Sequence, residues 1–134
     1  MASIGFVEAF AHFDAKLVNK NWAVSALAKD GALVLSCWTQ YFGTLNGGVL
    51  RYTDRLSRWT GNDAGRNLLA EHLKTAFSEE RIVRMVVATA KNPTLVEKVS
   101  DASKIRKTFH VRDDVVGRLT EFDGDNFVIA FARP

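Results

Sequence analysis

The chain has 134 residues, of which 47% are hydrophobic and 25% are charged, and its formal net charge is +3. This composition is typical of a globular protein and argues against a disordered one, and the length suits a single domain, 1–134. A domain of this size buries enough surface to need no stabilising metal, and the single cysteine, Cys37, excludes an intramolecular disulfide.

Neither a membrane segment nor a secretory signal is visible in the sequence. No apolar run approaches the ~18–20 residues that a membrane span requires. The first residues also lack a basic segment ahead of an apolar one. We therefore expect a cytoplasmic protein without membrane contact.

The charge is distributed unevenly along the chain. Residues 1–50 hold three lysines and three acidic residues, residues 51–112 hold thirteen Lys or Arg and seven acidic residues, and residues 113–134 hold two arginines and five acidic residues. A basic middle of net +6 therefore lies between a neutral front and an acidic tail of net −3. A basic segment beside several aromatic residues is typical of a surface that contacts phosphates and bases.

The first half of the chain predicts a helix followed by a hairpin. Over 4–18, apolar residues recur at spacings of three and four, which predicts an amphipathic helix with Ser3 as its cap. The segments 22–28 and 32–38 flank Asp30-Gly31, which supplies the positive φ of a tight hairpin turn. Neither face of this hairpin is strongly polar, so we expect it to be covered on both sides and central in its sheet.

A turn-rich break at 43–48 precedes a short strand at 49–53 and an arginine-bearing run at 54–59. A helix is predicted over 64–77, capped by Asn62 or Asp63, and an interior strand over 81–90. The polar stretch 94–108 suggests one short helix. A second hairpin is expected from 115–122 and 127–132, joined by the turn at Asp123-Gly124-Asp125.

This order of elements predicts an α+β fold. We expect a mostly antiparallel sheet of five to six strands with two or three helices packed against one of its faces.

Catalytic and metal-binding patterns are weak. No phosphate-binding glycine loop or dinucleotide fingerprint occurs, and His12, His72 and His110 are too far apart in sequence to present paired ligands. Cys37 lies within an apolar strand, where core packing is the expected role rather than nucleophilic catalysis. We therefore expect no cofactor or metal and favour a binding protein over an enzyme.

The nucleic-acid hypothesis depends on arginines and lysines that lie close in sequence to aromatic residues. Guanidinium groups bind phosphates and stack on rings, and indole or phenol rings offer a face to a base. The candidate residues are Arg51, Arg55, Arg58, Trp59, Tyr52, Tyr41, Lys104, Arg106, Lys107, His110 and Arg112. We expect these residues to form a basic patch that binds nucleic acid, DNA above all, beside a nuclease or modification enzyme on another chain.

Other readings of the same residues stay open. The aromatic residues could be core anchors and the cations ordinary solvated charge. The chain could instead be a small protein-interaction domain, an inhibitor or adaptor, that uses the exposed parts of 43–62 and the acidic tail, or a homodimer in which that tail meets the basic middle of a second copy. A third alternative is a small enzyme with a histidine-containing pocket, in which His72 or His110 meets a partner distant in sequence.

Overall fold

The computed structural model describes residues 4–19, 22–44, 48–58, 62–90 and 107–133. These described residues form two α-helices, two short 3-10 helices and eight strands. In chain order these are α1 Phe6–His12, β1 Ser25–Leu27, β2 Leu33–Trp38, η1 Thr39–Tyr41, β3 Phe42–Thr44, β4 Leu50–Arg55, η2 Leu56–Arg58, α2 Asp63–Ser78, β5 Ile82–Ala90, β6 Lys107–Val111, β7 Val116–Phe122 and β8 Asn126–Ala132.

The strands form one sheet in the order β1-β2-β5-β7-β8-β4-β3. Strand β6 lies off this path and pairs with the second half of β5, from Val86 to Ala90, while β7 pairs with its beginning at Ile82 and Val83. All described pairs are antiparallel except β2 with β5. Because β2 and β5 run in parallel, the connection between them crosses over through β3, β4 and α2.

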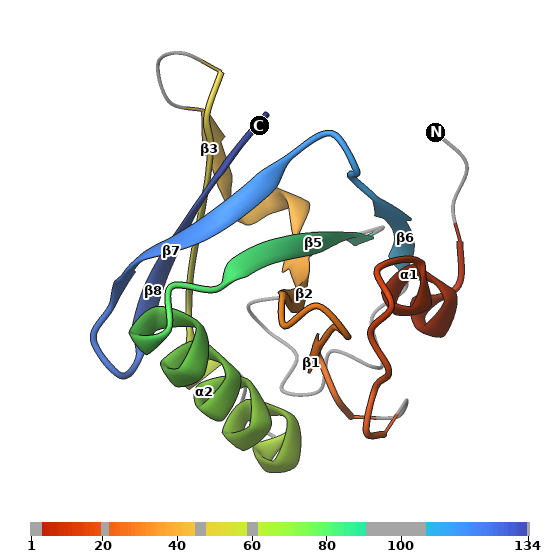
Figure 1. The fold of residues 1–134 in the computed structure, drawn as a ribbon, viewed down its shortest axis with the longest axis horizontal. Coiled ribbons are helices and arrows are strands. Elements are labelled where there is room, and N and C mark those ends of the chain that lie inside the picture. The colour runs from red at the N-terminus through yellow and green to blue at the C-terminus, as the bar shows by residue number, and fades with distance from the viewer. Residues whose placement is uncertain (1–3, 20–21, 45–47, 59–61, 91–106, 134) are drawn as a thin grey trace.

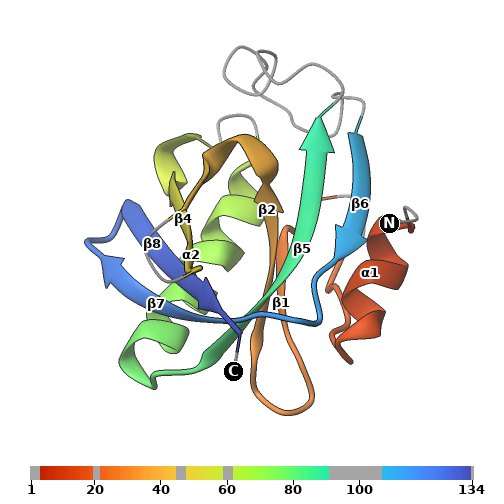
Figure 2. The same cartoon turned by 90° about the horizontal axis from the view of Figure 1, so that it is seen from above.

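The sheet curves around α2, and this curvature encloses the larger core (Figure 2). The strands β2, β5, β7, β8 and β4 are consecutive in the sheet, and all of them turn side chains into one cluster, among them Leu35, Met85, Phe127 and Ile129. Helix α2 fills the concave side with Leu69, Leu73 and Ala76. The side chain of Asn62 caps this helix by accepting a hydrogen bond from the Gly65 amide at 3.1 Å.

A second core lies on the opposite face of β2 and β5. Val34 and Val86 point to this side and pack with Ala9 and Phe10 of α1. The ring of Phe6, also on α1, lies against Phe109 of β6, with 4.8 Å between the centroids. The two helices therefore cover opposite faces of the sheet, and α1 lies over the β5–β6 end (Figure 1).

The α+β class and the mostly antiparallel sheet are confirmed, but the expected strand count and the placement of helices on one face are wrong. Within the described ranges the sheet has eight strands rather than five to six, and helices lie on both faces. Strand β3 lies partly in the segment interpreted as a turn-rich break, and β6 lies at the end of the polar stretch. Strand β3 has only three residues and β6 only five, so neither is long enough for an alternating pattern to stand out from the turn or polar residues beside it.

The two predicted hairpins are present, as are the second helix and the strand at 81–90. Most residues of the β1–β2 hairpin are buried, but the expectation that it is central in the sheet is wrong for β1, which lies at the edge. Helix α1 is shorter than 4–18 because the chain turns at Asp14, with φ 58°, and Ala15 then bridges to Ala28. The expected cap Ser3 and the segment 94–106 lie outside the described residues.

No helix in the described part of the chain is long and apolar enough to cross a membrane.

Candidate nucleic-acid interface

Three residues of the basic middle form a buried hydrogen-bonded network. Arg58, on η2, donates two hydrogen bonds to the carboxylate of Asp54, from Nε at 2.7 Å and from Nη2 at 2.7 Å. The Tyr52 hydroxyl donates to the same carboxylate at 2.7 Å and accepts from the Trp38 amide at 3.2 Å. Only 5% of the Arg58 side chain and 1% of the Asp54 side chain are exposed.

Electrostatics fit a structural role for this network. Burial and the nearby Asp54 charge raise the pKa of Tyr52 well above its usual value, so the hydroxyl stays protonated and keeps donating. Burial alone would lower the pKa of Arg58, but the hydrogen bonds and charge of Asp54 outweigh it and raise that pKa. Tyr52 and Arg58 therefore fasten β4 and η2 to the core, and neither offers a free face to a base or a phosphate.

The other described candidates form two groups, one on η1 and β4 and the other at β6. Tyr41 is half-buried on η1, where the Arg58 guanidinium lies 5.1 Å from the centre of its ring. Lys107, His110 and Arg112 lie on β6 or just after it, and Lys107 Nζ is 5.9 Å from the centre of the Phe109 ring. Trp59, Lys104 and Arg106 lie outside the described residues.

Sheet order keeps these two groups apart. Strand β6 pairs with β5, whereas β4 is separated from β5 by β8 and β7. The cations of β4 and of β6 therefore do not meet as neighbours across a pair of strands. Desolvation lowers the pKa of His110, and the positive charge of Arg112 acts in the same direction.

Two predicted arginines do share an exposed surface, on the outer side of β4. Arg51, Thr53 and Arg55 alternate with the buried Tyr52 and Asp54 along this strand. Next to β4, β8 turns only small side chains outward, and beyond β8 lies β7. We call this surface the open face; its outward residues are Arg51, Thr53 and Arg55 of β4, Asn126, Val128, Ala130 and Ala132 of β8, and Val116, Arg118 and Glu121 of β7.

The register of the open face places two arginines on either side of one alanine. Ala130 pairs with Arg51 on one side and with Arg118 on the other. Both helices lie elsewhere, because α2 packs on the inner face and α1 covers the β5–β6 end (Figures 1 and 2). The open face thus carries a row of cation, small residue and cation.

Neighbouring polar groups hold these arginines in place. Arg51 Nη2 lies 3.8 Å from Glu121 Oε2, and both side chains are largely exposed. Arg118 Nη1 donates to the backbone carbonyl of Glu80 at 2.7 Å. A wide, exposed pair of this kind contributes little to stability, so an anion could replace Glu121 as the partner of Arg51 at small cost.

Arg118 was not among the residues predicted from the sequence, because it lies in the acidic tail, outside the basic middle. A signal was present in the final hairpin, where Phe127, Ile129 and Phe131 alternate with Val128, Ala130 and Ala132. This alternation of large and small residues indicates which side of β8 is outward, but the neighbours of β8 become known only with the sheet order.

The acidic tail forms contacts within the chain. Asp113 Oδ1 lies 2.6 Å from His12 Nε2, and Asp125 accepts hydrogen bonds from the amide and hydroxyl of Ser57. Arg112 forms two hydrogen bonds with Asp114, which lower the pKa of that carboxyl to about 2. The tail carboxylates therefore help to hold α1, η2 and the final hairpin in position, rather than forming one acidic surface.

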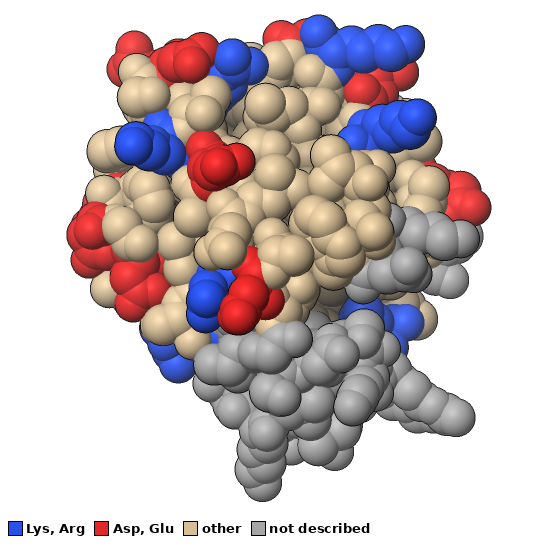
Figure 3. All heavy atoms as spheres, turned by 90° about the horizontal axis from the view of Figure 1, so that it is seen from below, with Lys and Arg blue, Asp and Glu red and all other residues tan. Residues whose placement is uncertain are grey.

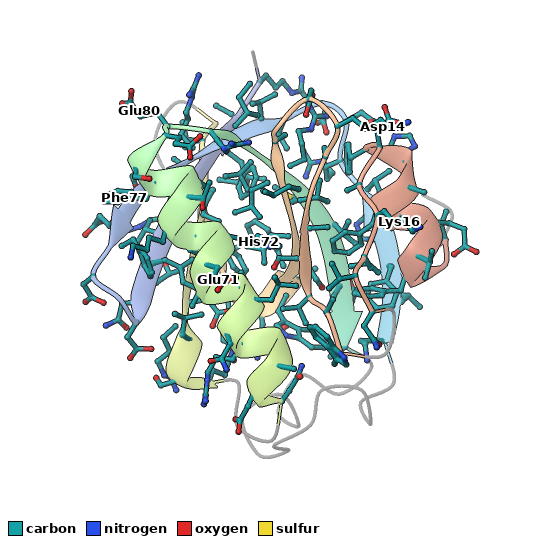
Figure 4. The ribbon with its side chains drawn as sticks, turned by 60° about the horizontal axis from the view of Figure 1, so that its bottom comes forward. Asp14, Lys16, Glu71, His72, Phe77 and Glu80 are labelled. Atoms are coloured by element: carbon teal, nitrogen blue, oxygen red, sulfur yellow. The ribbon has the colours of Figure 1, made fainter. Side chains whose placement is uncertain are left out.

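His72 has a partner that the sequence did not reveal. It lies on the side of α2 that faces the β1–β2 hairpin (Figure 4), and its Nδ1 is 2.8 Å from Ser25 Oγ. Burial lowers the pKa of His72, opposed by the charge of Glu71. Ser25 is only 1% exposed, so its hydroxyl is sealed from any substrate and the pair is structural.

Cys37 is also buried. Burial raises the pKa of Cys37 well above its ordinary value, which keeps the thiol neutral and poorly nucleophilic. No group of three metal-binding side chains occurs in the described part of the chain.

The face in Figure 3 bears no continuous basic patch. Lys and Arg alternate there with Asp and Glu around the margin, and the middle is mostly uncharged. On this face the described residues therefore do not form the basic patch expected from the sequence.

A search of protein-family models, of curated proteins and of solved structures found no significant match to the chain.

Proposed function

We propose that this chain is a nucleic-acid-binding module that contacts the phosphate backbone through the open face. One observation carries the proposal: Arg51 and Arg118 flank Ala130 on a sheet surface that neither helix covers. Arginine binds phosphate oxygens through two parallel hydrogen bonds, so a pair of outward arginines is suited to a chain of phosphates.

The charge of the open face supports a polyanionic ligand. Its outward residues include Arg51, Arg55 and Arg118 against the single acid Glu121. This binding surface contains fewer residues of the basic middle than we expected from the sequence. Tyr52 and Arg58 are not part of it, because their side chains are buried and hydrogen-bonded to Asp54. Arg51 and Arg55 keep the phosphate-binding role, and Arg118 is added.

Binding can be tested with the double variant Arg51→Gln/Arg118→Gln. Fluorescence anisotropy would follow a labelled oligonucleotide of about 12 nucleotides, a length within the usual range of single-strand sites. Measurements between about 50 and 200 mM salt give the slope of log affinity against log salt, which is about 0.7 per neutralised phosphate of a single strand. We expect the double variant to lower affinity at least about tenfold and the slope by about 1.4.

The control is Arg66→Gln/Lys74→Gln, which removes the same charge from α2 on the other side of the sheet. This control should lower affinity only slightly, through the reduced net charge. An equal loss in both double variants would show that the open face is not the site. No binding at about 50 mM salt would contradict nucleic-acid binding altogether.

A further inference from the structure

Strand β7 contains a β-bulge that decides which side of the sheet Glu121 faces. Leu119 pairs with Ile129 of β8, and the next pair is Glu121 with Val128, so the ladder contains one extra residue, Thr120. Side chains alternate between the two faces of a strand, and without the extra residue Glu121 would point inward, as Leu119 does. The bulge instead turns Glu121 outward onto the open face.

The outward carboxylate of Glu121 lies beside the arginine of β4. Arg51 Nη2 is 3.8 Å from Glu121 Oε2, although β8 lies between the two strands. The residues of β8 that pair with them, Ala130 and Val128, are small and leave room for this contact above the strand. Arg51 therefore already has an anionic partner when no ligand is bound.

A carboxylate and a phosphate compete for the same guanidinium group, because both accept its N–H donors through oxygen atoms. A phosphate that binds Arg51 must therefore displace Glu121. The Arg51 side chain is 45% exposed and that of Glu121 is 68% exposed, and ion pairs so accessible to water are weak. Glu121 should accordingly lower the affinity for a polyanion without abolishing binding.

We infer that Glu121 is a built-in competitor of the ligand, which occupies Arg51 in the unliganded chain and is displaced when a phosphate binds. This inference rests on the proposed function and adds to it a residue that limits affinity. It also gives the bulge at Thr120 a consequence for binding, since the bulge brings an acidic side chain onto a surface that otherwise carries arginines.

The test measures the affinity of the labelled oligonucleotide for the intact chain, for Glu121→Gln and for a matched control, Glu71→Gln. Each substitution removes one negative charge and keeps the size of the side chain, and Glu71 is exposed on α2, on the other side of the sheet (Figure 4). Arg51→Gln and Arg51→Gln/Glu121→Gln complete a double-mutant cycle, which isolates the interaction between the two residues. Thermal unfolding followed by circular dichroism verifies that every variant is folded.

We expect Glu121→Gln to bind the oligonucleotide about three- to fivefold more tightly than the intact chain, which is the gain that release of an exposed ion pair supplies. The control should gain only slightly, through its higher net charge. In the Arg51→Gln background most of the gain from Glu121→Gln should disappear, because the group for which Glu121 competes is absent.

Three outcomes would overturn the inference: unchanged affinity in Glu121→Gln, an equal gain in Glu71→Gln, or a gain that persists undiminished in the Arg51→Gln background. The last would show that Glu121 repels the ligand without occupying Arg51. In each case, weaker binding by Arg51→Gln/Arg118→Gln than by Arg66→Gln/Lys74→Gln would leave the proposed function standing. Binding by neither the intact chain nor Glu121→Gln would overturn both proposals.

Discussion

At the scale of single residues, burial decides what each charged group does. Arg58 and Arg51 belong to the same basic stretch, yet the side chain of Arg58 is 5% exposed and that of Arg51 is 45% exposed. The first forms two hydrogen bonds with Asp54, and the second makes a loose ion pair with Glu121. Because the two arginines lie close in sequence, the same role was predicted for both. Their different burial gives them different roles.

Replacing Arg58 by methionine should destabilise the chain strongly. The variant leaves the buried Asp54 carboxylate without its ionic partner, a defect that costs about 3–5 kcal/mol in comparable cases. Urea denaturation would measure the loss in the free energy of unfolding. Arg66→Met is the control, because the Arg66 side chain is 35% exposed and that of its ion-pair partner Asp63 is 75% exposed, and solvent-accessible pairs contribute about 1 kcal/mol at most. Similar losses in both variants would contradict a structural role for the network.

His72 should make the stability of the chain depend on pH in the acidic range. Its pKa is lowered by burial in the folded chain, so between that pKa and its ordinary value of about 6.5 the unfolded chain binds more protons. The free energy of unfolding should therefore fall as the pH drops from about 7 to 5, and His72→Gln should reduce this fall.

The pKa of His110 is also lowered, so His110→Gln should reduce the fall in the free energy of unfolding independently of His72→Gln. Hydrogen bonds lower the pKa of Asp114 and Asp123, so their contributions are lost only below about pH 4. The same pH dependence in wild type and His72→Gln would show that His72 does not contribute.

At the scale of elements, local chemistry specifies the ends of helices and the turns. Asn62 caps α2 and also donates to the carbonyl of Trp22 at 3.1 Å, which joins the start of the helix to the segment before β1. Gly31, with φ 91°, closes the β1–β2 turn, and Gly124, with φ 101°, closes the β7–β8 turn. Each of these signals acts over a few residues, which is why the sequence predicted them.

Gly65→Ala should destabilise the chain although alanine favours helices. A Cβ at Gly65 would lie 2.4 Å from the Trp22 carbonyl oxygen, so the contact between α2 and that segment must shift. Overpacking of this kind costs about 1–3 kcal/mol and exceeds the propensity gain of about 1 kcal/mol at most. Asn67→Ala, at an exposed position of the same helix, should instead stabilise slightly, and chemical denaturation of both would reveal the opposite signs.

The sequence predicted the helices and strands better than it predicted which of their residues share a surface. The alternation in 49–53 already put Arg51 and Thr53 on one side of a strand, and β4 confirms it. The neighbour of Arg51 across the sheet is Ala130, which is seventy-nine positions later in the chain. No local pattern encodes such a pairing, so the open face could not be derived before the sheet order was known.

At the scale of the whole molecule, the two main cores share the same strands. Along β2, Leu35 points into the core that contains α2, whereas its neighbour Val34 points into the core beneath α1. Both side chains are fully buried. Loss of either core therefore disturbs the strand on which the other one depends.

We expect the chain to unfold in a single cooperative step. Leu35→Ala and Val34→Ala should each move the same unfolding transition to a lower midpoint. Leu35→Ala should lower the free energy of unfolding by about 2 kcal/mol or more. Far-ultraviolet circular dichroism and tryptophan fluorescence should give coincident curves in wild type and in both variants. Two resolved transitions, each moved by only one of the substitutions, would contradict the coupling.

The sequence by itself determined the α+β class, both hairpins, the helix at Asp63–Ser78 and the alternation that turns Arg51 outward. These features arise from turn residues, caps and periodicities that act between near neighbours. The tertiary structure decided the order of strands, the parallel pairing of β2 with β5, the burial of Arg58 against Asp54 and the placement of Arg51 and Arg118 on either side of Ala130. Most of these depend on contacts between distant parts of the chain, and the burial of Arg58 depends on what packs around it. Only the complete packing of the sheet selects them.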